Sequence, residues 1–136
     1  FFESLSEQQW NTEVYTEGSI WTIRNILAHL VTAESAFVKL FGSIRDGGPG
    51  VSEDFSIDRY NARQQEKTGD LTAQELLTRY RSVRAEMVQF VAGLEDADLE
   101  KIGRHPFLQR TSLREMVKMV YLHNQIHYRD LKKVLK

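Results

Sequence analysis

The sequence contains no cysteine among its 136 residues. Disulfide bonds, thiolate catalysis and thiolate metal ligands are therefore excluded, and any metal ion must be held by nitrogen and oxygen atoms. No apolar run approaches the roughly 20 residues that a membrane-spanning helix needs, and no signal peptide is visible. We therefore expect a cytoplasmic protein. The formal net charge of −1 gives no electrostatic reason to expect nucleic acid or a membrane as a partner.

The length predicts a single domain, residues 1–136, with a core that needs no covalent support. Residues 1–10 resemble the end of a first helix, and the start at Phe1 rather than Met suggests that most of this helix lies upstream. A second helix is expected to begin after Gly18, with Ser19 as its N-cap, and to end near Ile44. The glycine and proline run at residues 47–50 ends it, and residues 51–69 resemble a loop with a short helix around 58–65.

Two later helices carry capping-box signatures. Thr72 and Glu75 predict the start of a third helix, and Leu71 before them can pack onto Leu76. Ser112 and Glu115 repeat this signature at the start of a last helix that reaches the C-terminus. The core stripe of the third helix is Leu76, Tyr80, Val83, Met87 and Phe90. No alternating strand pattern of useful length appears, so we predict an all-α fold: an antiparallel four-helix bundle with a long crossover between helices 2 and 3.

Histidines in the second and last helices are the most informative chemical feature. His123 and His127 are four residues apart, which places them on one face of a helix. They share that face with Met116, Val120 and Val134, which points them into the bundle. His29 lies in the apolar run of the second helix, where Ala33 and Ala36 leave room beside its ring. Spacing alone leaves two alternatives open, a three-histidine metal site or a hydrogen-bonded core trio.

Known metal motifs narrow the kind of site. A zinc protease needs Glu directly after the first histidine, where this chain has Asn124. Di-iron bundles need Glu three residues before a histidine, and none of the four histidines has one. Two histidines on one helix cannot bind opposite sides of a haem. A mononuclear three-histidine site with open coordination positions remains, the arrangement that catalytic zinc uses.

Several neighbouring residues have both a functional and a structural interpretation. Glu34 is the one candidate for a catalytic base, although a surface or helix-pairing role is the more common one for such a residue. Asn124 could orient a ligand or pack as a polar core residue. His105 is interpreted as a loop-fixing or rim residue, and Arg104 could receive an anionic substrate. Aromatic side chains expected to serve only bundle packing are Trp21, Tyr80 and Tyr121.

Three segments together resemble the DinB-like (DinB/YfiT-like) metal-binding four-helix bundles. The segment WTIRNILAHLVTAE (residues 21–34) resembles the second-helix signature of that family. The segment FSIDRYN (residues 55–61) resembles the part between its helices 2 and 3. HPF (residues 105–107), followed by a helix with His123 and His127, is similar to its C-terminal part. Family members often have Gly where this chain has Leu108 and Gln109, so the loop at that rim is expected to differ.

The resemblance implies a metal site formed by His29, His123 and His127. Zn²⁺ or Ni²⁺ is the expected ion, because imidazole suits both. The implied function is a metal-dependent enzyme, either a transferase that uses a low-molecular-weight thiol such as bacillithiol or mycothiol, or a hydrolase. A noncatalytic metal-binding or stress-related bundle is the alternative. The resemblance also implies a homodimer, and a second apolar stripe on the second helix agrees with it: Leu27, Val31, Val38 and Phe41.

Overall fold

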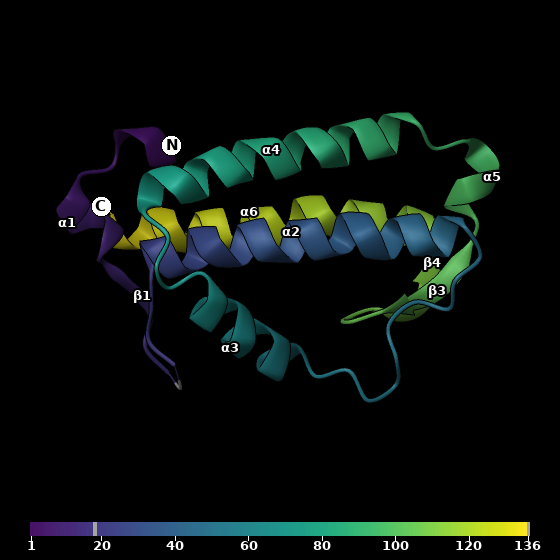
Figure 1. Cartoon of the computed structure of the whole chain (residues 1–136), viewed down its shortest axis with the longest axis horizontal. Coiled ribbons are helices and arrows are strands. Elements are labelled where there is room, and N and C mark those ends of the chain that lie inside the picture. The colour runs from purple at the N-terminus through teal and green to yellow at the C-terminus, as the bar shows by residue number, and fades with distance from the viewer. Residues whose placement is uncertain (18, 136) are drawn as a thin grey trace.

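The computed structural model describes residues 1–17 and 19–135. Its frame consists of three long helices that pack along one another, α2 (Ile23–Arg45), α4 (Ala73–Ala92) and α6 (Leu113–Val134) (Figure 1). Shorter helices join them: a 3-10 turn η1 (Phe2–Ser4), α1 (Glu7–Trp10), α3 (Ile57–Lys67) and α5 (Asp96–Leu99). The predicted all-α bundle is confirmed, and the short helix expected around residues 58–65 is α3.

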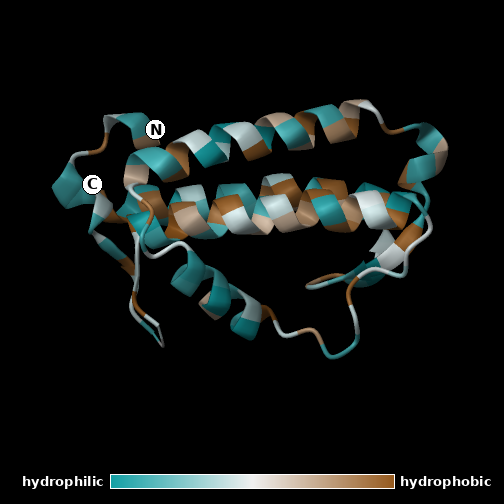
Figure 2. Cartoon of the chain, viewed as in Figure 1, coloured by the Kyte–Doolittle hydropathy of each residue, from teal (hydrophilic) through white to brown (hydrophobic). Residues whose placement is uncertain are grey.

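The crossover between α2 and α4 determines the directions of the long helices. Residues 46–72, which include α3, carry the chain back to the end where α2 began (Figure 1). As a result α2 and α4 run parallel, with Glu34 beside Arg84 and Phe41 beside Phe90. The last helix α6 runs antiparallel to both. α3 is mainly hydrophilic and lies outside the three-helix layer (Figure 2).

Local capping interactions fix where the long helices begin. Thr72 and Glu75 form the predicted reciprocal capping box, and the Ser112 hydroxyl accepts from the Glu115 N–H as expected. Ser19 as the N-cap of α2 is wrong. The cap is Thr22, whose hydroxyl accepts from the Asn25 N–H while the Asn25 side chain accepts from the Thr22 N–H. Ser19 lies in a bend before the two-residue strand Trp21–Thr22, and Gly18 lies outside the described residues.

Two short antiparallel hairpins interrupt the helices, and the sequence did not predict them. β1 (Glu13–Tyr15) pairs with β2 (Trp21–Thr22), and β3 (Ile102–His105) pairs with β4 (Gln109–Ser112). Residues 1–10 are not the end of one helix, because extended backbone at Leu5 separates η1 from α1. Phe2 and Trp10 stack there with ring centroids 5.7 Å apart and close one end of the core.

α2 is the central helix and is covered on several sides. Leu27, Val31 and Phe41, from the stripe that suggested a dimer, are buried within the chain, where side chains of α4 pack with them. The homodimer therefore loses this support and stays a prediction. By length and composition α2 also resembles a membrane span, but more than half of that stretch is buried inside the protein. Two packing predictions are wrong, since Val134 and Tyr121 are 36% and 66% exposed.

Candidate metal centre

His29, His123 and His127 meet between α2 and α6. The Nε2 atom of His123 lies 3.1 Å from Nε2 of His29 and 3.2 Å from Nε2 of His127. The cluster is tight: one ring nitrogen from each residue lies within 4.8 Å of the other two. Two nitrogens bound at about 2.05 Å to one ion lie roughly 2.9 Å apart at about 90° and roughly 3.3 Å apart at the tetrahedral angle. The two separations from His123 therefore fit ligands of a single ion, and His29 and His127 lie on either side of His123.

A tyrosine from β1 orients one of these rings. The Tyr15 hydroxyl donates to Asp130 Oδ2 at 2.6 Å and lies 3.0 Å from Nδ1 of His127. Since the hydroxyl has one hydrogen, which Asp130 accepts, the proton on His127 must lie on Nδ1 and point to the tyrosine oxygen. Nε2 of His127 then presents its lone pair to the cluster. Such a relay from a carboxylate fixes the tautomer that a metal ligand needs.

Burial keeps all three imidazoles neutral. It lowers the pKa of His29 to about 3 and that of His123 to about 4, with the neighbouring histidines adding to both effects. The pKa of His127 is also lowered by burial, against the opposing effect of Asp130. Burial and the bond to Asp130 raise the pKa of Tyr15. Neutral imidazole is the form that binds metal, so this environment is compatible with such a role.

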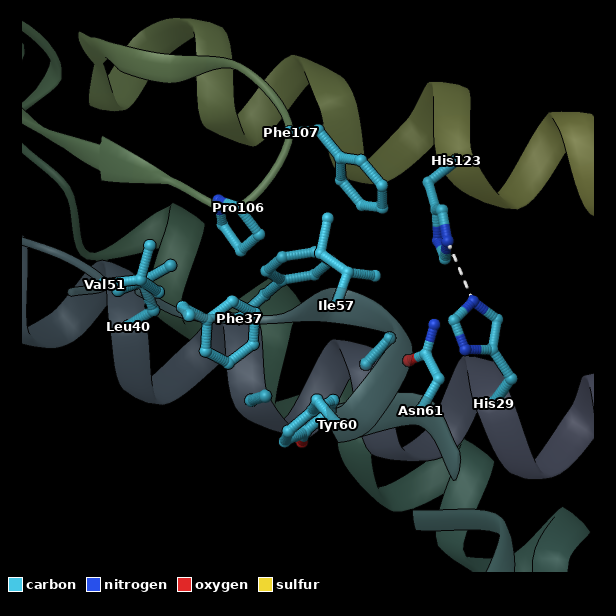
Figure 3. Close-up of a pocket in the computed structure, with 13 residues that line it drawn as sticks. His29, Phe37, Leu40, Val51, Ile57, Tyr60, Asn61, Pro106, Phe107 and His123 are labelled. Carbon is cyan, nitrogen blue, oxygen red and sulfur yellow. Dashed lines mark hydrogen bonds between the residues drawn. The ribbon is translucent and has the colours of Figure 1, made fainter. Parts of the chain in front are cut away.

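An apolar pocket opens directly beside His29 and His123 (Figure 3). α2 contributes one wall, where the small side chains of Ala33 and Ala36 leave the space that was predicted from the sequence. α3 and the residues before it contribute the facing wall, and the tip of the β3–β4 hairpin contributes Pro106 and Phe107. A polar amide, that of Asn61, lies at the histidine end (Figure 3). The segment at residues 55–61 thus lines the pocket.

Glu34 lies elsewhere in the structure. Its Oε1 atom accepts from Arg84 Nη1 at 2.8 Å and from Asn124 Nδ2 at 3.3 Å, where α2, α4 and α6 meet. Both Glu34 and Asn124 are buried. These contacts match the helix-pairing interpretation of Glu34 and the polar-packing interpretation of Asn124, and they leave both side chains engaged away from the histidine cluster.

His105 and Arg104 hold the β3–β4 hairpin. The Nδ1 atom of buried His105 accepts from the backbone N–H groups of Phe107 and Leu108 at 3.0 and 3.1 Å, so this residue fixes the loop as expected. Its ring stacks on Phe37 with centroids 5.4 Å apart. The Arg104 guanidinium lies 3.2 Å from Glu53 rather than in the pocket. The hairpin is thereby anchored with Phe107 at the pocket.

Tyr15 and Asp130 are the members of the site that sequence reasoning missed. Asp130 follows His127 by three residues, so a carboxylate on the histidine face was visible in the pattern of α6. Tyr15 gave no such signal, because it belongs to a strand of three residues and its partners lie more than 110 positions away.

A bundle of long helices with three convergent imidazoles beside a pocket defines a class of protein, the helical bundles with a three-histidine cluster. The chain belongs to the DinB superfamily, whose family model matches residues 1–131. Among solved structures it is similar to an uncharacterised protein from Escherichia coli UTI89, with 13% identity and a TM-score of 0.76 over 98% of this chain and 81% of that chain. That similarity supports the fold alone. No curated protein matches this chain.

Proposed function

We propose that the protein is a divalent-metal-dependent enzyme in which His29, His123 and His127 hold one ion and a small-molecule substrate reaches it through the adjoining pocket. The convergence of the three Nε2 atoms is the observation that carries this proposal. Structural zinc sites normally use four protein ligands, whereas catalytic sites use three and keep a position open. Zn²⁺ or Ni²⁺ is the proposed ion, because imidazole nitrogen suits both.

The bound ion would supply a hydroxide or a thiolate at neutral pH by lowering the pKa of coordinated water or thiol. This chemistry supports two reaction classes, transfer with a low-molecular-weight thiol and hydrolysis. The side chains of this chain would position the reactants. Burial holds the imidazoles neutral, Tyr15 orients His127, and the amide of Asn61 can bind a polar group of the substrate. With no cysteine in the chain, a thiol would enter as cosubstrate.

Metal content tests the site directly. We expect near-stoichiometric metal by elemental analysis in the wild type and a loss of metal in His123→Ala. His105→Asn is the matched control, because it removes a buried histidine outside the cluster and should retain the ion. Metal retained in His123→Ala, or absent from a wild type incubated with Zn²⁺ or Ni²⁺, would overturn the proposal.

Turnover separates an enzyme from a noncatalytic bundle. The metal-loaded protein should accelerate either thiol conjugation of electrophiles or hydrolysis of esters and amides, and chelation or His123→Ala should abolish this activity. A protein that binds metal stoichiometrically and turns over neither class of substrate would instead support the noncatalytic metal-binding bundle.

A further inference from the structure

The pocket beside the histidines is lined mainly by apolar side chains. Its volume is about 110 Å³, and nine of its thirteen lining residues have apolar side chains. The polar exceptions are His29, His123, Asn61 and Tyr60. The Tyr60 hydroxyl lies 3.4 Å from the carbonyl oxygen of Thr32, so it has a partner within the protein. The polar groups left for a ligand are therefore the two imidazoles and the amide.

These polar groups gather at one end of the pocket. Figure 3 shows Asn61 next to His29 and His123, with Leu40 and Val51 at the opposite end and Phe37 and Ile57 between them. A ligand that fills this space must be amphiphilic, with a polar end at the histidines and an apolar end toward Leu40. Apolar pockets with a few convergent polar groups are typical of small-molecule sites.

Exposed aromatic side chains mark the entrance. Phe55, from the crossover, is 38% exposed, and Phe107, at the tip of the β3–β4 hairpin, is 46% exposed. Both line the pocket, and the ring centroids of Phe107 and His123 are 6.4 Å apart. Large apolar side chains that remain accessible around a cavity are typical of ligand-binding surfaces.

We infer that the pocket binds the apolar group of the substrate, a branched alkyl group or a single ring, while the polar reacting group lies at the histidine cluster and Asn61. The volume limits the size: a closed cavity of roughly 150 Å³ encloses one whole benzene, whereas this smaller pocket is open at its entrance and can take most of one ring. A long chain or a fused ring system would not fit within about 110 Å³. This inference rests on the proposed function only for the position of the reacting group.

Acetohydroxamate and benzohydroxamate share one metal-binding group, and a comparison of the two tests the substrate class. In the zinc-loaded protein the phenyl compound should bind at least about tenfold more tightly than the methyl compound, because its ring leaves water for the pocket. Ala36→Phe, which fills the pocket, should abolish this preference. Ala85→Phe, an equal substitution on the exposed face of α4, should preserve it. Val51→Trp fills the other end and serves if Ala36→Phe does not fold.

A metal-free arm keeps this inference distinct from the proposed function. Toluene has no metal-binding group, and it should bind the chelator-treated wild type and Ala85→Phe, but not Ala36→Phe or Val51→Trp, in ligand-observed NMR. Equal toluene signals in filled and unfilled variants, or no signal in the wild type, would overturn the pocket assignment. Toluene binding without zinc binding would overturn the metal site and leave the apolar pocket supported. Equal, zinc-dependent binding of both hydroxamates would overturn the substrate class alone.

Discussion

His105 should make the stability of the fold depend on pH. Its Nδ1 atom accepts two backbone N–H groups, so its proton lies on Nε2, which is buried and has no hydrogen-bond partner among the described residues. A second proton would occupy Nδ1, break both bonds and place a charge in the core. Burial accordingly lowers the pKa of His105 from 6.5 to about 4.

The direction in which stability changes with pH follows from the protonation of His105 in the folded and unfolded states. Above pH 6.5 the imidazole is neutral in both, and its contribution to stability is complete. Between pH 6.5 and about 4 the unfolded chain binds a proton that the folded protein does not, so the stability of the fold decreases as the pH is lowered. The difference of roughly 2.5 pKa units corresponds to about 3 kcal/mol at the acid limit and about 2 kcal/mol at pH 5. For a domain of this size, 2 kcal/mol shifts Tm by roughly 7 °C.

His105→Asn isolates this contribution. The Asn carbonyl oxygen can accept the same two N–H groups but does not titrate. Thermal unfolding of both proteins, followed by circular dichroism in chelator at pH 7.5 and 5.0, should show that the wild type loses roughly 7 °C more than the variant. His29, His123 and His127 also destabilise the acid form in both proteins. Because His105 lowers the pKa of His123 as well, the variant also loses that part of the His123 contribution, which acts in the same direction. Equal losses of Tm would refute the reasoning, whatever the offset at pH 7.5.

Three further predictions concern the Tyr15–His127 contact, the buried Glu34–Arg84 pair and the close approach of Gly50 to β3. Tyr15→Phe should weaken Zn²⁺ binding about 10- to 100-fold in a calorimetric titration, because His127 loses the partner that fixes its tautomer; unchanged affinity would contradict this role. Arg84→Met should cost about 3 kcal/mol in urea unfolding by leaving the Glu34 carboxylate buried and unpaired, and adding Glu34→Leu should restore most of it. Gly50→Ala should cost about 1–3 kcal/mol, since its φ is 93° and a Cβ there would collide with the β3 backbone. Gly47→Ala, with φ 99° and open space, should cost less.

The sequence predicted the helices because their signals are local. Thr72 and Ser112 each bond to a backbone N–H three residues ahead, so the motif and its structure lie within one turn. The two hairpins gave no comparable signal. β3 holds four residues, including Gly103 and Arg104, and is too short to display an alternating pattern. Its pairing with Gly50, more than fifty positions earlier, depends on the tertiary fold.

Similar reasoning explains which parts of the site could be predicted. The face of each histidine follows from the helical period, and the three rings converge as that period and the family resemblance indicated. The same geometry argues against Glu34 as a partner of His29. Five residues advance an α-helix by about 500°, so Glu34 lies roughly 140° around α2 from His29. It therefore faces Arg84 on α4, which is where the structure places it.

The orientation of His127 by Tyr15 could not be deduced in this way, because no periodicity relates a three-residue strand to a helix more than a hundred residues later. Helical periodicity thus locates candidate ligands, whereas their protonation state and the pocket beside them depend on contacts that only the folded chain defines.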